Sequence, residues 1–151
     1  MILGLMLHIL GAVVWVGGMF FAYVVLRPYA GALEAPARLA LWRGVFQKFF
    51  PWVWASILAL LASGYGMLFL VMGGFGGAGV HVHVMNLTGL IMMALFLHLY
   101  FAPWKRMRRA LDAGETADAA RQLGQIRMLV AINLTLGLIT SVIGASGRYW
   151  G

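Results

Sequence analysis

Cysteine is absent from this chain, and charged side chains make up only 10% of its 151 residues. Without cysteine the protein can form no disulfide, iron–sulfur cluster, thiolate metal site or covalently attached c-type haem. Soluble domains are about 25% charged and about 45–50% apolar, whereas 63% of this chain is hydrophobic. This shortage of polar surface excludes a soluble enzyme and predicts one integral membrane domain over residues 1–151.

Acidic residues are also few, with four Asp and Glu against eleven Lys and Arg and a net charge of +7. Basic residues in a chain this apolar more often determine membrane topology than bind nucleic acid. No glycine-rich phosphate loop is present. We therefore expect the lipid bilayer, and not a nucleic acid, to be the main partner.

Long apolar runs are abundant. Four of them can cross a hydrocarbon core about 30 Å thick as helices, at roughly residues 2–26, 52–73, 80–101 and 128–147. Open sheet edges cannot exist in lipid, so the sequence predicts an all-α bundle of four transmembrane helices. The first run lacks a basic leader and a cleavage site, and we expect it to remain as a span.

The segment between the first two spans has a different pattern. Leu39, Trp42, Val45, Phe46 and Phe49 recur at helical spacing, with Arg and Lys residues between them. This pattern predicts an amphipathic helix that lies in the plane of the membrane interface between spans 1 and 2.

Basic residues are concentrated in two connections, at 27–51 and 102–127, whereas the glycine-rich connection near residues 73–79 has none. By the positive-inside rule both basic connections are cytoplasmic. The sequence thus predicts a multi-pass protein of a bacterial-type inner membrane, with both termini outside.

Two histidines occupy equivalent places in the two halves of the chain. His8 precedes Pro28 by the same number of residues as His83 precedes Pro103, a separation of about 30 Å along a helix. The halves have the same orientation, which indicates a parallel repeat and puts both histidines at one depth near the outer face. His81 and His98 cannot share a metal with them, because they differ in direction or in depth.

A haem b held by His8 and His83 is the main functional hypothesis from these residues. Trp15 shares a helix face with His8, and Asn86 shares one with His83. Arg148 is placed to contact a propionate. Stripes of small residues on spans 1, 2 and 4 leave room for a flat tetrapyrrole. The implied role is electron transfer or an oxidoreductase activity, with a quinone or a porphyrin as partner and a homo-oligomer possible.

Ten methionines raise copper as the alternative cargo, because thioether and imidazole ligands suit Cu(I). They form no repeated ladder on one helix face, and methionine also fills gaps in apolar cores. A third alternative is a structural assembly subunit with an unoccupied groove.

The first span reads L-H-I-L-G-A-V-V-W-V-G-G-M-F-F, and V-H-V-M-N and F-L-H-L-Y-F-A-P follow later. These motifs resemble those of small CopD-like inner-membrane proteins and of the related HemJ-type protoporphyrinogen oxidases. The resemblance covers nearly the whole chain, and F-A-P-W-K-R-M-R-R-A-L is closer to the CopD-like group. The HemJ-type resemblance implies a four-helix haem b protein with His8 as ligand, and the CopD-like resemblance implies copper handling. No span of this chain contains the lysine that is typical of HemJ-type proteins.

The topology can be tested with reporter fusions. Fusions after residue 76 and at the C-terminus should report a periplasmic location, and fusions near residues 40 and 113 a cytoplasmic one, because the basic connections remain inside. A cytoplasmic C-terminus would contradict the predicted number of spans.

Overall fold

The computed structural model describes residues 2–150, except for the side chain of Arg148, and is helical almost throughout. The helices are α1 (Ile2–Phe20), η1 (Phe21–Leu26), α2 (Arg27–Gly31), α3 (Ala35–Leu70), η2 (Phe75–Gly77), α4 (Val80–Leu99), η3 (Tyr100–Trp104), α5 (Lys105–Asp112), α6 (Thr116–Ser146) and η4 (Gly147–Tyr149). η1 and η3 are π-helical, and η2 and η4 are short 3₁₀ turns. The predicted all-α class is confirmed.

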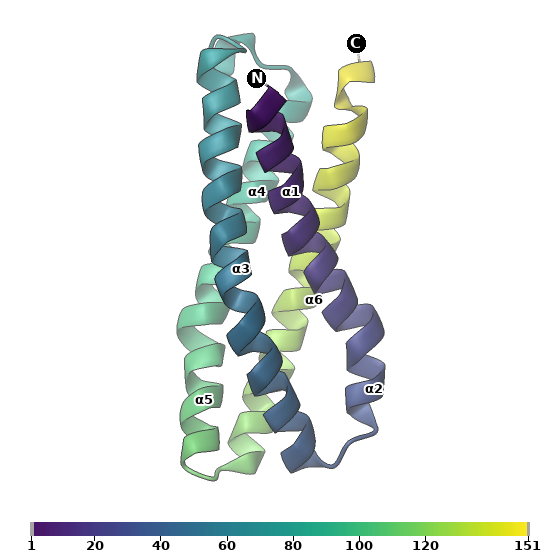
Figure 1. The fold of residues 1–151 in the computed structure, drawn as a ribbon, viewed down its shortest axis with the longest axis vertical. Helices are drawn as coiled ribbons and strands as arrows, with labels where there is room; N and C mark the ends of the chain where they lie inside the picture. Colours follow the sequence, from purple (N-terminus) through teal and green to yellow (C-terminus); the bar gives the residue numbers. More distant parts are fainter. Residues whose placement is uncertain (1, 151) are drawn as a thin grey trace.

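Consecutive elements join into four rods that are long and apolar enough to cross a membrane: Ile2–Gly31, Ala35–Leu70, Val80–Asp112 and Thr116–Ser146. The rods run up and down in a bundle, with N, C and the α3–α4 connection at one end (Figure 1). The two basic connections lie at the other end. The predicted multi-pass bundle is confirmed. Its orientation in the membrane stays a prediction.

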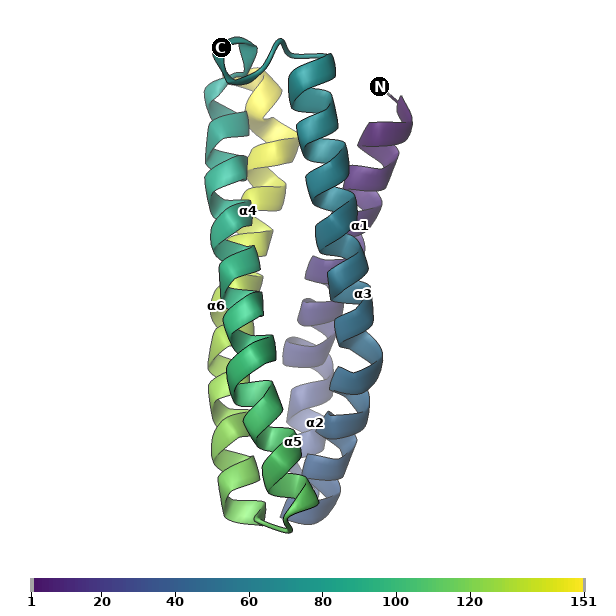
Figure 2. The ribbon, with the colours of Figure 1, turned by 90° about the vertical axis from the view of Figure 1, so that its left-hand side faces the viewer.

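The bundle consists of two helical hairpins. α1 packs mainly along α3, and α4 packs mainly along α6, an arrangement that is visible from the side in Figure 2. The first rod of each hairpin has a π-helical segment near its proline. η1 ends shortly before Pro28, and η3 contains Pro103. Proline removes a backbone donor and disturbs the regular helix, so the two hairpins share this local feature as well as their orientation.

The predicted interfacial helix between spans 1 and 2 is wrong in its placement. Its residues are helical, but they form the first part of α3, which continues through Pro51 to Leu70. The 36 residues of α3 extend about 54 Å, well beyond a hydrocarbon core of about 30 Å. The first part of α3 therefore projects along the bundle and does not lie in the interface plane.

The physical reason is that the apolar face of this segment packs against protein. Trp42 and Phe46 are each only 4% exposed. The Phe46 ring lies 5.6 Å from that of Trp104, at the end of η3. On the more exposed face of this segment, Arg43 pairs with Asp112 of α5 at 2.8 Å. The amphipathic pattern is the same for a helix on lipid and for a helix on protein, and here the partner is protein.

A continuous ladder of aromatic rings forms the core of the bundle. Phe50 lies 5.4 Å from Trp104 and 5.6 Å from Phe96, and Phe96 lies 6.2 Å from Trp15, all in edge-to-face geometry. Such pairs contribute about 0.5–1.5 kcal/mol each beyond the burial of their area. The ladder connects α1, α3, α4 and η3, and we infer that it is the main source of rigidity at the basic end.

Phe50→Ala should destabilise the protein by about 3–5 kcal/mol, because it removes a buried ring that contacts several others. Thermal unfolding in detergent measures this loss. The matched control is Phe21→Ala, since Phe21 is 57% exposed. Equal destabilisation by both variants would show that the ladder has no special role.

Candidate metal centre

His8 lies between α1 and α3. Its ring occupies space that Gly64 of α3 leaves open: a Cβ atom on Gly64 would stand 3.2 Å from the imidazole Cε1 and 3.5 Å from Nδ1. The Cε1–Nδ1 edge of the ring therefore faces α3. A larger residue at position 64 would press on the ring, so this glycine makes room for the histidine.

A hydrogen bond fixes which nitrogen of His8 carries the proton. Nδ1 lies 3.0 Å from the hydroxyl oxygen of Ser63, and the same hydroxyl donates to the carbonyl oxygen of Ala59 at 2.5 Å. A serine hydroxyl has a single proton. Since the shorter contact directs that proton to Ala59, we infer that Nδ1 of His8 donates to Ser63. Nε2 then keeps its lone pair, the form in which a histidine binds a metal.

A thioether lies at the same interface. The sulfur of Met67 in α3 stands 3.9 Å from the position of a Cβ on Gly4, and its Cγ stands 3.5 Å away. Gly4 and His8 are four residues apart and so share one face of α1. The sulfur and the imidazole thus belong to one α1–α3 interface, about one helical turn apart. Imidazole and thioether are both uncharged groups that can bind transition metals.

His83 has different neighbours. It is exposed, and its ring stacks on Phe75 of η2 with centroids 5.9 Å apart. Asn86, one turn further along α4, accepts a hydrogen bond from the Tyr65 hydroxyl at 3.0 Å. Tyr65 and Ser63 are two residues apart, which separates them by about 200° around α3. His8 and the helix face that carries His83 therefore contact different sides of α3. That the two histidines bind one haem iron together stays a prediction.

The other predicted site residues are distributed along the bundle. Trp15 is 2% exposed and belongs to the aromatic ladder, about two turns from His8. The side chain of Arg148 lies outside the described residues. His81 packs against Gly147 and near the Trp150 ring, and His98 is exposed.

The small-residue stripe of α6 does not leave the room that was predicted for a tetrapyrrole, because side chains of α1 and α4 fill it. A Cβ on Gly137 would lie 2.9 Å from Val16 and 3.0 Å from Met92, and one on Gly144 would lie 2.9 Å from Met85. Thr140 in the same stripe bonds to Thr88 at 2.7 Å. The stripe serves close packing of α6 against its neighbours.

No three His, Cys, Asp or Glu side chains within residues 2–150 come together as a metal-binding group. A centre of the carboxylate–histidine kind therefore does not form in this part of the chain. Ser63 and Met67 were missed as site residues. Ser63 is visible in the sequence as one of several small residues on span 2, but its partner on another helix is not.

Ser63→Ala should leave Nδ1 of His8 without its acceptor and lower stability by about 1–2 kcal/mol. Nitrogen-15 NMR of labelled histidine should show the Nδ1–H tautomer for His8 in the unaltered protein and a changed signal in the variant. Ser141→Ala is the control, because Ser141 bonds only to Gly137 of its own helix among the contacts described. A proton on Nε2 in the unaltered protein would contradict the assignment.

Residues 43–146 match the family model described as copper resistance protein D. The matched range runs from the first part of α3 to the end of α6 and leaves out α1, which contains His8. No curated protein and no solved structure matches this chain significantly.

Proposed function

The chain belongs to the copper resistance protein D family, and on this premise we propose that it binds Cu(I) inside the membrane as a copper-binding or copper-transporting protein. The description of the family concerns copper resistance, and the four apolar rods give the chain a membrane location. The proposal adds a chemical species and a site to these two facts.

The observation that carries the site is the chain of hydrogen bonds from His8 through Ser63 to Ala59. On this reading Nε2 of His8 is a lone-pair donor in the half of the bundle that holds the α3–α4 connection. The thioether of Met67 lies one turn away at the same interface. Imidazole and thioether bind Cu(I) well and bind hard cations such as Mg²⁺ or Ca²⁺ poorly. These two ligands would therefore favour Cu(I) over the hard cations.

The charge of the site also suits a monovalent ion. His8 and Met67 are both neutral donors, and no acidic residue occurs between positions 2 and 33 or between 35 and 111. A divalent ion would bring two uncompensated charges into a low-dielectric region, whereas Cu(I) brings one. Methionine is flexible and polarisable, which allows the ligands to bind and release an ion without movement of the helices.

The observations support haem b less well than copper as the species that the protein binds. Its two proposed ligands, His8 and His83, have separate contacts, and the α6 stripe is filled by side chains. The family description names copper. An electron-transfer or oxidoreductase role, a quinone or porphyrin partner, a homo-oligomer and a relation to HemJ-type proteins stay predictions of the sequence.

Anaerobic titration of the purified protein with Cu(I), against a competing chelator, tests the proposal. The unaltered protein should bind Cu(I), and His8→Ala and Met67→Leu should each weaken binding by about tenfold or more, because each removes a ligand. His98→Ala is the matched control, because His98 is an exposed span histidine.

An absorption spectrum of the protein as purified distinguishes the two cargoes. We expect no Soret band. A Soret band that disappears in His8→Ala would overturn the copper proposal in favour of haem b. Cu(I) binding that is unchanged in both ligand variants would overturn the site.

A further inference from the structure

A second pair of imidazole and thioether side chains lies in the second hairpin, where α4 packs along α6 (Figure 2). His81 and Met85 are four residues apart on α4. They therefore share one helix face, with about 5–6 Å between their Cβ atoms. We propose that this pair is a second Cu(I) site, distinct from the pair formed by His8 and Met67.

Two glycines of the α6 rod make room for both donors. A Cβ on Gly147 would overlap the ring of His81. A Cβ on Gly144 would lie 3.3 Å from the sulfur of Met85 and 2.9 Å from its Cε. Because a side chain at either glycine would push one donor away, the close approach of the two helices brings the imidazole and the thioether into one interface.

The nitrogens of His81 are not used by the protein. His81 makes no hydrogen bond with the described residues 2–150, and its ring lies edge-on to that of Trp150 with centroids 6.4 Å apart. A neutral imidazole always has one nitrogen with a lone pair. His81 can therefore bind a metal without breaking a hydrogen bond of the protein.

The next polar group on this face of α4 is already satisfied. The Thr88 hydroxyl lies 3.0 Å from the carbonyl oxygen of Val84 and 2.7 Å from the hydroxyl of Thr140. The polar contacts between α4 and α6 thus continue below the proposed site, and the two groups left for a ligand are the imidazole of His81 and the thioether of Met85.

The identity of the ion rests on the proposed function. Imidazole and thioether are uncharged and suit Cu(I) better than hard cations. No acidic residue occurs between positions 35 and 111 or between 119 and 151, so no carboxylate of these segments can balance a second positive charge in an apolar region. The donors and the charge both favour a soft monovalent ion, as they do at His8 and Met67.

The position of the pair is suited to receiving an ion from water. His81 is the second residue of α4, at the end of the bundle that holds both termini (Figure 1), whereas His8 is the seventh residue of α1. His81 thus lies nearer to the end of its helix. Each hairpin then has one imidazole–thioether pair, and the pair at His81 would take up Cu(I) before the pair at His8 holds it.

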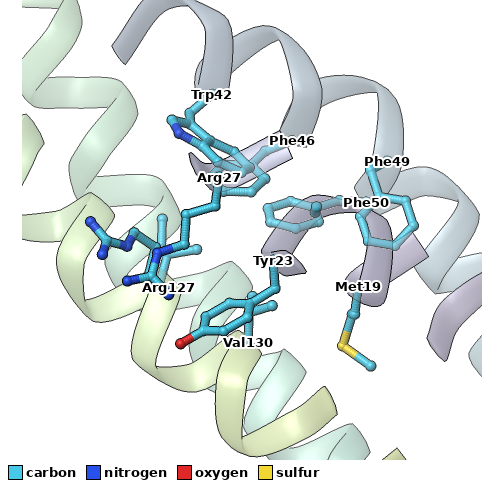
Figure 3. A pocket seen from close by; sticks show the side chains of 11 residues that line it. Met19, Tyr23, Arg27, Trp42, Phe46, Phe49, Phe50, Arg127 and Val130 are labelled. Carbon is cyan, nitrogen blue, oxygen red and sulfur yellow. The ribbon is translucent and has the colours of Figure 1, made fainter. Parts of the chain in front are cut away.

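Met19, toward the opposite end of the bundle, has different surroundings. It lines a small pocket together with Phe49 and Phe50 (Figure 3), and no histidine is among the described residues that line it. It is only 3% exposed. Met19 is therefore a thioether of the core without an imidazole beside it, which makes Met19→Leu a matched control for Met85→Leu.

Anaerobic titration with Cu(I) against a competing chelator counts the sites. The unaltered protein should bind two equivalents, and the double variant His8→Ala, Met67→Leu should keep one. Adding His81→Ala or Met85→Leu to this double variant should weaken the remaining site by about tenfold or more, because each removes a ligand. Adding Met19→Leu or His98→Ala should leave it unchanged.

Copper X-ray absorption of the double variant, loaded with one equivalent of Cu(I), gives a test that needs no change at His81 or Met85. The spectrum should show both nitrogen and sulfur as nearest neighbours of the metal. Nearest neighbours without sulfur would overturn the role of Met85. This measurement keeps the proposal testable if the variants of His81 or Met85 fail to fold.

The titration separates failure of this inference from failure of the proposed function. One equivalent that is lost in His8→Ala and unchanged in His81→Ala and Met85→Leu would overturn the second site and leave the proposed function intact. One equivalent with the opposite dependence would support the second site and overturn the first. No Cu(I) bound by the unaltered protein would overturn both.

Discussion

A polar group inside a bilayer has no water to bond with, and this constraint controls both the backbone and the few polar side chains of this protein. The backbone satisfies it by forming helices over nearly every described residue. Several side chains satisfy it by bonding to their own helix or to a neighbour, whereas Gln122 Oε1 and Asn133 Oδ1 are buried without a partner among the described residues. Thr140 bonds across to Thr88 at 2.7 Å, and the amide of Asn133 donates to the Met92 carbonyl at 3.2 Å. Both contacts fix how α6 meets α4.

The same constraint explains the state of His8. A histidine in a span must place its proton on an acceptor, and the acceptor here is Ser63, whose own proton is already given to Ala59. The carbonyl of Ala59 can only accept a hydrogen bond, and this sets the direction of both bonds in the chain from His8 through Ser63. The free lone pair on Nε2, which we propose as a Cu(I) ligand, is thus a consequence of polar satisfaction in lipid, and Ser63 orients the ring that carries it.

Sequence patterns predicted the helices well and their partners poorly. Apolar length predicts a span because bilayer thickness is fixed, and all four spans were found. Periodicity shows which face of the helix over 35–51 is apolar. Lipid and a protein side chain such as Trp104 can each cover that face, so the pattern did not reveal that the helix packs against protein. The stripe at Gly137 and Gly144 shows close approach, but the side chains that occupy it come from α1 and α4. The contact of His8 with Ser63 depends on the register of two helices, which no local pattern encodes.

The two ends of the bundle are held by different forces. At the basic end, interlocked rings of Phe46, Phe50 and Trp104 connect the hairpins, and a large ring cannot move without displacing its neighbours. Toward the end that holds the α3–α4 connection, the interfaces contain glycines, hydroxyls and flexible thioethers, which rearrange more easily. Ligands that bind and release an ion need this second kind of interface.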